Sequence, residues 1–368
     1  VHHDKGFLVV GVEAAGWGRL LTEGFQVEVD ETLTRHYCHP APPLEGQRSG
    51  IPGYPCYATV EETFAEGEAM AAAHPDLATW FDVGDSWEKT HAGGLPGYDL
   101  MVLKLTNSAV PGTPTGTTPP HGKPRFLFTA TIHAREYGTG ALALDFARYL
   151  LDNYGIDAVA TWLLDEHEIH ILFYVNPDGR KLAEAGDLWR KNTDNDDGCS
   201  YSSSWGTDLN RNFSYQWGCC GGSDSDPCGE TYRGPSPAPE PETQAVRDYL
   251  RAIFPDQKGP NPTDPAPATA TGVYLDLHSA AALALWPWGF TSTVPPNGTA
   301  LQTLGRRSAY FNGYTPDQSI GLYVTDGTTI DFAYGDLGVA SYTFELSGSF
   351  FEPCSSYLGT IVPDNLPA

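Results

Sequence analysis

Short apolar runs alternate with longer segments of helical spacing along most of the chain. The runs that predict buried strands are residues 80–83, 100–105, 125–132, 168–175, 273–277 and 340–344. Apolar positions at helical spacing predict helices over residues 59–74, 138–154 and 243–254. Strands alternating with helices are typical of an α/β fold in which a mixed, mainly parallel sheet carries helices on both faces.

A segment rich in proline and glycine separates the N-terminal residues from the remainder of the chain. Proline and glycine recur between residues 40 and 55, where they interrupt regular structure. Before them the pattern predicts a strand, a short helix and a strand, over residues 7–12, 15–23 and 25–29. We therefore expect an N-terminal extension over residues 1–50 and a single large domain over residues 51–368. Residues 113–120, rich in threonine, proline and glycine, are predicted to form a surface loop.

Residues with metal-binding side chains stand where apolar runs end. His133 and Glu136 follow the run that ends at Ile132, and His278 ends another run. Two nearby ligands and a distant third, with a fourth position left open, are typical of a catalytic zinc. Each residue alone is commonly a helix start or a core histidine. Because Glu345 ends a further apolar run, a shared site at the carboxyl ends of the strands is the better interpretation.

Composition narrows the classes of partner. The formal charge of −25, from 46 acidic and 21 basic residues, would repel phosphate, so we expect no nucleic acid partner. No apolar run approaches the roughly 18 residues of a membrane span, so we expect no membrane partner. The many glycines, prolines and aromatic residues are common in secreted enzymes. We expect a secreted monomer whose signal peptide has been removed.

The 7 cysteines also favour a secreted protein. None belongs to a matched pair of C-x-x-C motifs, so disulfides are favoured over a structural zinc site. One cysteine must then be left over. The alternative is that all of them are reduced, buried residues of a cytosolic protein.

Several short segments occur in one order along the chain: residues 133–136 (HARE), 176–179 (NPDG), 189–192 (WRKN), 208–213 (DLNRNF), 231–234 (TYRG), 277–279 (LHS) and 343–346 (TFEL). From about residue 54 onward, this series resembles the zinc metallocarboxypeptidases of the carboxypeptidase A type. The resemblance implies a metallocarboxypeptidase that removes the C-terminal residue of a peptide or protein. It also implies one zinc ion per chain, held by His133, Glu136 and His278.

The resemblance assigns roles to further residues. Glu345 is implied as the general base that activates water together with zinc and then passes the proton to the leaving amine. Arg190 is implied to stabilise the oxyanion of the intermediate. Asn210 and Arg211 are implied to hold the terminal carboxylate of the substrate, over which Tyr323 closes. Without this motif context, a buried salt bridge would explain Glu345, and charge neutralisation would explain the two arginines.

The same resemblance places Ile330 at the base of the pocket for the C-terminal side chain. Three residues resemble the members with apolar pockets: Leu285, Gly289 and Thr343. An apolar or aromatic C-terminal residue is therefore expected to be preferred. Asp326 and Thr328 stand in the same segment and leave open a mixed preference that includes basic residues. Ala280 stands where many relatives have a tyrosine in the outer subsites.

The resemblance pairs Cys199 with Cys228 around the segment that carries Arg211. Two further pairings rest on proximity alone: Cys38 with Cys56, and Cys354 with Cys219 or Cys220. Residues 1–50 resemble the end of a propeptide, too short for a complete prodomain, and so predict a zymogen.

An acidic loop offers a second candidate metal site. Asp194, Asp196 and Asp197 carry oxygen ligands suited to Ca²⁺, although the twelve-residue EF-hand pattern is absent. A solvated acidic loop is the alternative interpretation.

Two other classes of function stay open. A related zinc amidohydrolase that acts on cell-wall peptides or acylated amino acids would share the metal ligands but need a differently shaped pocket. A binding module that kept the fold without catalysis is disfavoured, because no metal ligand and no general base is missing. The Asn210 and Arg211 pair favours the carboxypeptidase.

Overall fold

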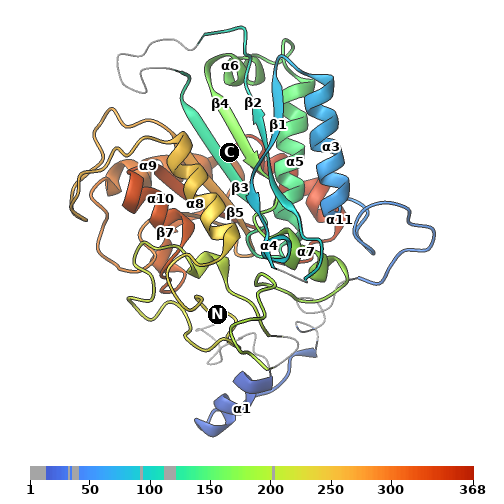
Figure 1. Ribbon diagram of the computed structural model, residues 1–368, viewed down its shortest axis with the longest axis vertical. Coiled ribbons are helices and arrows are strands. Elements are labelled where there is room, and N and C mark those ends of the chain that lie inside the picture. The colour runs from blue at the N-terminus through green and yellow to red at the C-terminus, as the bar shows by residue number, and fades with distance from the viewer. Residues whose placement is uncertain (1–13, 32–33, 35–40, 92–93, 112–121, 201–203) are drawn as a thin grey trace. The chain divides into compact units, whose positions relative to one another are not determined.

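The computed structural model describes residues 14–31, 34, 41–91, 94–111, 122–200 and 204–368 (Figure 1). The chain divides into two units, Val1–His39 and Pro40–Ala368. In the first unit the predicted helix is confirmed as α1 (Ala14–Thr22). The predicted strand at residues 7–12 lies outside the described residues, as does the predicted loop at 113–120. The expected extension over residues 1–50 stays a prediction.

The predicted strand at residues 25–29 is wrong. These residues have no regular structure and follow Gly24, whose φ is +87°. Phe25 and Val29 leave 57% and 53% of their surface exposed. Alternating apolar residues form a strand only where a partner satisfies their backbone groups and covers the apolar face, and the described residues of this unit provide neither.

The described residues of the second unit form an 8-stranded sheet in the order β1-β2-β4-β3-β5-β8-β6-β7. Its strands are β1 (Ala78–Asp85), β2 (Asp99–Leu105), β3 (Arg125–Ala130), β4 (Glu168–Leu172), β5 (Val273–Ser279), β6 (Leu283–Trp286), β7 (Thr315–Gln318) and β8 (Ala340–Leu346). The four central strands β4, β3, β5 and β8 are parallel, whereas β1 with β2, β2 with β4, and β6 with β8 pair antiparallel. The predicted mixed, mainly parallel sheet is confirmed.

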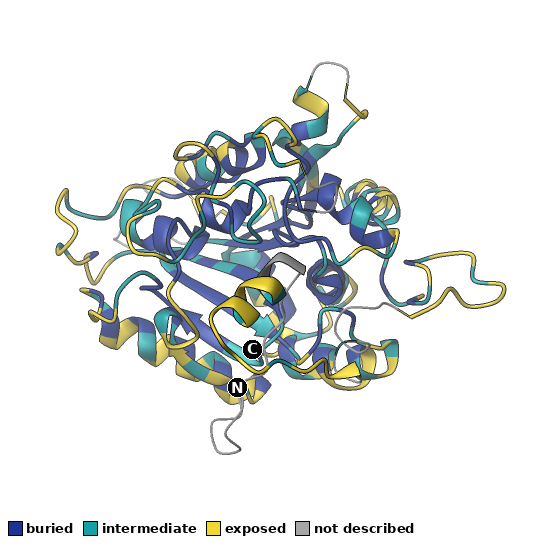
Figure 2. Ribbon diagram, turned by 90° about the horizontal axis from the view of Figure 1, so that it is seen from below, coloured by how far each residue is buried: buried dark blue, intermediate teal, exposed yellow. Residues whose placement is uncertain are grey.

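Helices pack on both faces of this sheet. They are α3 (Val60–Ala73), α4 (Trp87–Thr90), α5 (Tyr137–Asp152), α6 (Ala158–Glu166), α7 (Pro177–Glu184), α8 (Pro241–Ile253), α9 (Gly298–Asn312), α10 (Thr329–Leu337), α11 (Cys354–Ser356) and α12 (Val362–Asn365). Between them lie two 3₁₀-helices, η2 (Leu209–Arg211) and η3 (Ser319–Gly321), and a short π-helix, η4 (Tyr357–Ile361). The strands are mostly buried, while several helices turn an exposed side outward (Figure 2).

Alternation along the strands explains the two layers of the core. In β2, Leu103 and Leu105 join the cluster that α3 and α5 cover, whereas Val102 joins the cluster that α8 and α10 cover. Successive side chains of a strand point to opposite faces, so a strand that is apolar throughout needs a helix on each side. This requirement is why continuous apolar runs in the sequence predicted the correct fold class.

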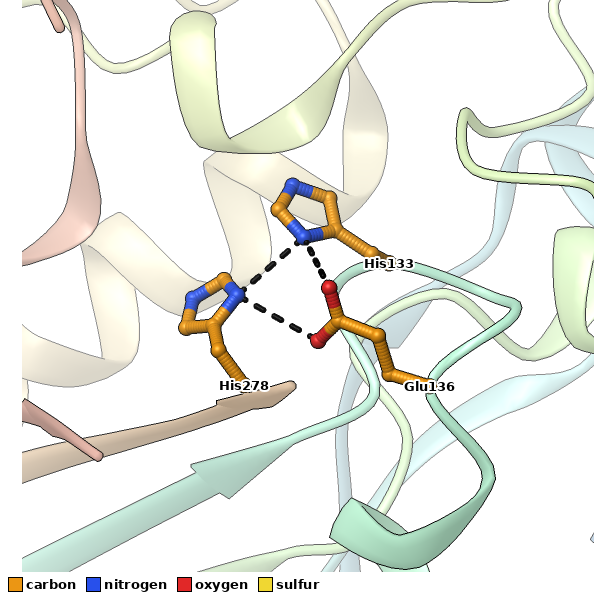
Figure 3. A group of neighbouring side chains, drawn as sticks. All are labelled: His133, Glu136 and His278. Atoms are coloured by element: carbon orange, nitrogen blue, oxygen red, sulfur yellow. Dashed lines mark hydrogen bonds and ion pairs between the residues drawn. The ribbon is translucent and has the colours of Figure 1, made fainter. Parts of the chain in front are cut away.

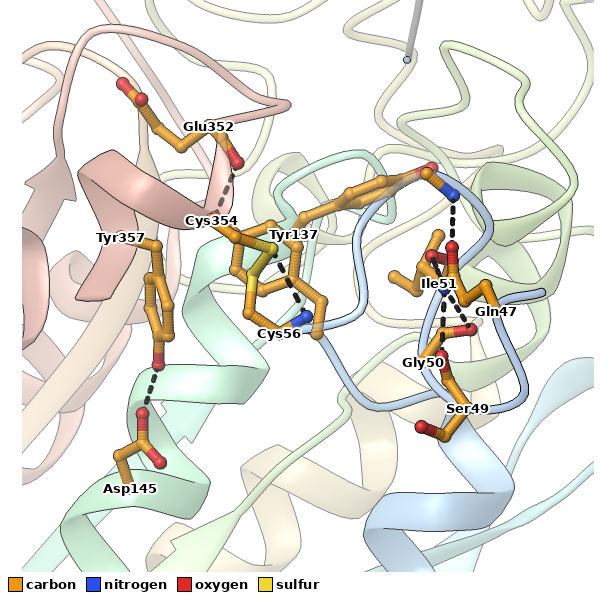
Figure 4. The surroundings of a disulfide bond; sticks show 12 residues. Gln47, Ser49, Gly50, Ile51, Cys56, Tyr137, Asp145, Glu352, Cys354 and Tyr357 are labelled. Atoms are coloured by element: carbon orange, nitrogen blue, oxygen red, sulfur yellow. Dashed lines mark hydrogen bonds between the residues drawn. A yellow bond between two sulfur atoms is a disulfide. The ribbon is translucent and has the colours of Figure 1, made fainter. Parts of the chain in front are cut away.

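Disulfides tie distant segments of the second unit together. Cys56 is bonded to Cys354, with a Cα–Cα distance of 5.6 Å (Figure 4). The adjacent Tyr57 hydroxyl donates to the Glu352 carbonyl, so the segment before α3 lies against the C-terminal segment.

Two predicted pairings are therefore wrong, because the half-cystines have other partners. Cys56 does not pair with Cys38, which lies outside the described residues, and Cys354 pairs with neither Cys219 nor Cys220, which are bonded to each other. The predicted bond between Cys199 and Cys228 is confirmed.

Replacing both Cys56 and Cys354 by serine should lower the free energy of unfolding by about 5 kcal/mol, because this bond closes a very long loop in the unfolded chain. Replacing Cys199 and Cys228, which are 29 residues apart, should lower it by roughly 3 to 4 kcal/mol. Urea unfolding followed by fluorescence measures both values. An equal or larger loss for the shorter loop would contradict the expectation.

Candidate metal centre

The predicted metal ligands come together at the carboxyl ends of two parallel strands. His133 and Glu136 lie in the turn that follows β3, and Glu136 is the N-cap residue of α5. His278 lies near the end of β5, which pairs in parallel with β3. Parallel strands end at the same edge of a sheet, so residues far apart in the sequence meet there.

The three side chains converge on a common point (Figure 3). His133 Nδ1 lies 2.8 Å from Glu136 Oε1, and His278 Nδ1 lies 3.3 Å from Glu136 Oε2. The two Nδ1 atoms are 3.1 Å apart, and all three residues are buried. One ligand atom from each residue lies within 4.8 Å of the others. Two imidazole nitrogens and a carboxylate are a donor set that suits Zn²⁺.

Two carboxylates orient the histidine rings. His133 Nε2 lies 3.1 Å from Asp208 Oδ1, and His278 Nε2 lies 3.1 Å from Asp276 Oδ2. A carboxylate that accepts the Nε2 proton leaves the Nδ1 lone pair directed at the metal position. Sequence reasoning missed both aspartates. Asp276 carried a usable signal, because it stands two residues before His278 in a strand and so lies on the same face.

Arg190 is buried against this group. Its Nε and Nη2 donate to Asp208 Oδ2 at 3.0 and 2.7 Å, and its Nη1 lies 3.3 Å from His133 Nδ1. Burial alone would raise the pKa of Asp208, but the neighbouring Arg190 and His133 hold it well below its usual value. The structure thus brings Arg190 next to the metal ligands.

Asn210 and Arg211 lie on the short turn η2 beside the same site. Asn210 Nδ2 lies 3.2 Å from His278 Nε2, while Asn210 Oδ1 accepts a hydrogen bond from the Thr329 backbone N–H. Arg211 donates from Nη1 to the Asn210 carbonyl and from Nε to the Gly222 carbonyl. Arg211 Nη2 donates no hydrogen bond within the described part of the chain.

Tyr323 lies close to Arg211, whose guanidinium carbon is 5.9 Å from the centre of the tyrosine ring. Half of the Tyr323 surface is exposed. Arg211 and Tyr323, which were predicted to act on the same substrate group, therefore lie close together, and Tyr323 is the more exposed of the two.

Glu345 lies at the end of β8, directly opposite His278 on the neighbouring strand β5. Burial raises the pKa of Glu345 to about 7, and the negative charge of Glu136 adds to this effect while His278 opposes it. A carboxyl group whose pKa is near neutral can take up and release a proton at physiological pH.

The residues predicted to form the specificity pocket surround the start of α10. Ile330 is buried, and Leu285 of β6 lies opposite Thr343 of β8. Gly289 donates its N–H to the buried carboxylate of Asp331, whose pKa burial raises to about 7.

Asp326 is fully buried in the same segment. Its Oδ2 accepts hydrogen bonds from the backbone N–H groups of Cys220 and Gly222 at 3.1 and 2.9 Å. Its Oδ1 is buried without a hydrogen-bond partner among the described residues.

The acidic loop forms a second cluster. Ligand oxygens of Asp194 and Asp197 lie within 4.8 Å of one another and of Glu240, which sequence reasoning missed. Asp196 instead lies 3.5 Å from His91. Burial raises the pKa of Glu240 to about 8, and Asp194 adds to this shift. Calcium binding at this loop stays a prediction.

The model of the zinc carboxypeptidase family matches residues 65–368. A zinc carboxypeptidase of Saccharothrix mutabilis subsp. capreolus is 35% identical over 319 residues, which are 83% of this chain and 65% of that protein. Carboxypeptidase A2 of Rattus norvegicus is 29% identical over 315 residues, which are 83% of this chain and 66% of that protein. The chain thus spans slightly less than two thirds of the length of these relatives.

A solved structure is also similar. Bovine thrombin-activatable fibrinolysis inhibitor, in complex with tick carboxypeptidase inhibitor, aligns with a TM-score of 0.68 at 26% identity. The alignment covers 84% of this chain and 94% of that chain.

Replacing Asp276 by asparagine should weaken zinc binding about 10- to 100-fold, because the His278 ring loses the carboxylate that orients it. Competition between the metal-free protein and a chromophoric chelator measures this affinity. Asp152→Asn, on an exposed residue at the end of α5, is the matched control and should bind zinc as the wild type does. An unchanged affinity in Asp276→Asn would contradict the assigned orientation.

Proposed function

Because the chain belongs to the zinc carboxypeptidase family, as the order of its motifs predicted, we propose that it hydrolyses the C-terminal peptide bond of peptides and proteins. The observation that carries this proposal is the position of Arg211 and Asn210 beside His133, Glu136 and His278. A fixed cation next to a metal centre selects substrates that end in a carboxylate. An endopeptidase has no use for such a group.

Zinc, when held by His133, Glu136 and His278, supplies a Lewis acid that polarises a carbonyl group and lowers the pKa of water. Asp208 and Asp276 keep the histidine rings oriented for this purpose. The buried donor set is consistent with this metal.

Glu345 moves the protons of the reaction. It accepts a proton from the attacking water and later returns it to the amine that leaves. Arg190 directs its guanidinium toward the metal centre and stabilises negative charge on the former carbonyl oxygen. Each role requires a group that is already fixed in place, and Asp208 provides that fixation for Arg190.

Arg211 and Tyr323 bind the end of the substrate. Two of the nitrogens of Arg211 are occupied by carbonyl groups, which fixes the guanidinium and directs Nη2 to the substrate carboxylate. Tyr323, half-exposed beside Arg211, closes over the bound carboxylate.

The C-terminal side chain enters a pocket with Ile330 at its base. An apolar or aromatic residue is preferred there, because the pocket has no exposed charge at that position. Asp326 extends this preference to basic residues, since its Oδ1 is buried without a partner and a cation would satisfy it.

The protein is secreted as a zymogen, and residues 1–50 belong to its propeptide. The disulfides of the second unit are consistent with an oxidising compartment. Among the described helices, none combines the length and apolar content that a membrane span requires. The active species is a monomer that binds no nucleic acid.

The loop with Asp194 and Asp197 takes up Ca²⁺.

Incubation with blocked dipeptides that differ in the C-terminal residue tests the proposed activity. The wild type should release the C-terminal amino acid, and a zinc chelator should abolish the release. Glu345→Gln should lower kcat about 10²- to 10⁴-fold, because it removes the general base while the metal ligands stay intact. Glu68→Gln, on the exposed side of α3, is the control. Full activity of Glu345→Gln would refute the proposed role.

Asp326→Asn tests the proposed specificity. The asparagine oxygen can still accept the N–H groups of Cys220 and Gly222, but the negative charge is lost. The kcat/KM for substrates that end in lysine or arginine should fall about 10- to 100-fold, as expected for a lost charged hydrogen bond. The kcat/KM for a substrate ending in phenylalanine should change little, and a parallel loss for both substrates would count against the assignment.

A further inference from the structure

Arg180, on α7, is a buried cation that the proposed reaction does not use. Its side chain is among the largest that are fully buried, and its guanidinium lies over the rings of Tyr137 and Tyr174, at 4.7 and 5.6 Å. A buried guanidinium is costly unless its donors are satisfied, so the positions of its partners indicate its purpose.

The donors of Arg180 point at the turn that carries two of the metal ligands. Nη1 donates to the carbonyls of Ala134 and Glu136, at 3.3 and 3.4 Å, and Nη2 donates to the Tyr137 carbonyl at 3.3 Å. Nε lies 3.7 Å from a carboxylate oxygen of Glu184, one turn further along α7. A single side chain thus binds three backbone carbonyls around Glu136.

This turn needs such a partner. Residues 131–136 lie between β3 and α5 and belong to neither. The Glu136 carbonyl accepts hydrogen bonds from Thr139 of α5, but the Ala134 carbonyl has no such neighbour among the described residues. Within the described chain, Arg180 is the only donor to the Ala134 carbonyl. The other end of α7 supports the same region, because Asn176 Nδ2 donates to the carbonyls of Ile132 and Lys191.

We propose that Arg180 is a positioning residue that holds the turn from His133 to Glu136 in its metal-binding conformation and so sets the affinity for the metal. The proposal rests on the proposed zinc site. A guanidinium can reach separate acceptors with its different nitrogens in one fixed plane. Without it, the Ala134 carbonyl loses its donor and the Glu136 carbonyl keeps Thr139 alone, so the turn can relax and move Glu136 away from the two imidazole nitrogens.

Zinc affinity, measured on the metal-free protein by competition with a chromophoric chelator, tests the proposal. Arg180→Met removes both the charge and the donors and should weaken zinc binding about 10- to 100-fold, the range seen when a group that orients metal ligands is lost. Arg180→Lys keeps the charge on one nitrogen and should give an intermediate loss. This second variant keeps the test valid if Arg180→Met does not fold.

Lys123 provides the matched control. It is also a buried cation, 5% exposed, and it donates to the Thr106 hydroxyl and to the carbonyls of Asn107 and Leu164. It stands before β3, at the opposite end of the strand from the metal ligands. Lys123→Met should lower the urea midpoint of the metal-free protein and leave zinc affinity unchanged.

Arg180 variants that lose stability as Lys123→Met does, but bind zinc within about twofold of the wild type, would overturn the proposal, since they would show a purely structural role. A wild-type protein that binds no zinc would overturn it together with the proposed function. A wild-type protein that binds zinc but releases no C-terminal residue would contradict the proposed function alone, and the affinities of the Arg180 variants would still decide the role of Arg180.

Discussion

The parallel pairing of β3, β5 and β8 is the constraint on which the rest of the structure depends. These neighbouring strands carry or lead into His133, His278 and Glu345, and they all end at one edge of the sheet. Helices must cover both faces of such a sheet, because its apolar strands cannot face water on either side. The two core layers and the position of the metal centre therefore follow from the same pairing.

Charge is concentrated and balanced at that edge. Although the chain carries a net charge of −25, Arg190 and Arg211 lie beside the metal ligands, where they offset the buried carboxylates. Identical chemical groups acquire different properties in this environment. The histidines lower the pKa of Glu136, whereas burial dominates at Glu345 and raises its pKa. Neighbouring carboxylates thus differ in how readily they hold a proton, as the proposed metal ligand and the proposed base require.

The local pattern of apolar residues predicted long helices and strands correctly, but it failed for short strands and for segments without a partner strand. The helix predicted over residues 59–74 is present as α3, and a capping box of Thr59 and Glu62 begins it in the structure. In contrast, β7 is polar and lies at the edge of the sheet, so no apolar alternation reveals it. Residues 25–29 show the opposite failure, because an apolar pattern without a partner strand forms no sheet.

The sequence by itself determined the fold class, the set of candidate metal ligands and the order of the motifs, because these depend on residue identity and local spacing. Only the tertiary structure decided which groups support the ligands. Asp208 and Arg180 contact the segment of His133 and Glu136 from positions far away in the chain, and the bond from Cys56 to Cys354 joins the two ends of the second unit. Spacing along a chain carries no record of such contacts, since they arise when the strands pair and the helices pack on them.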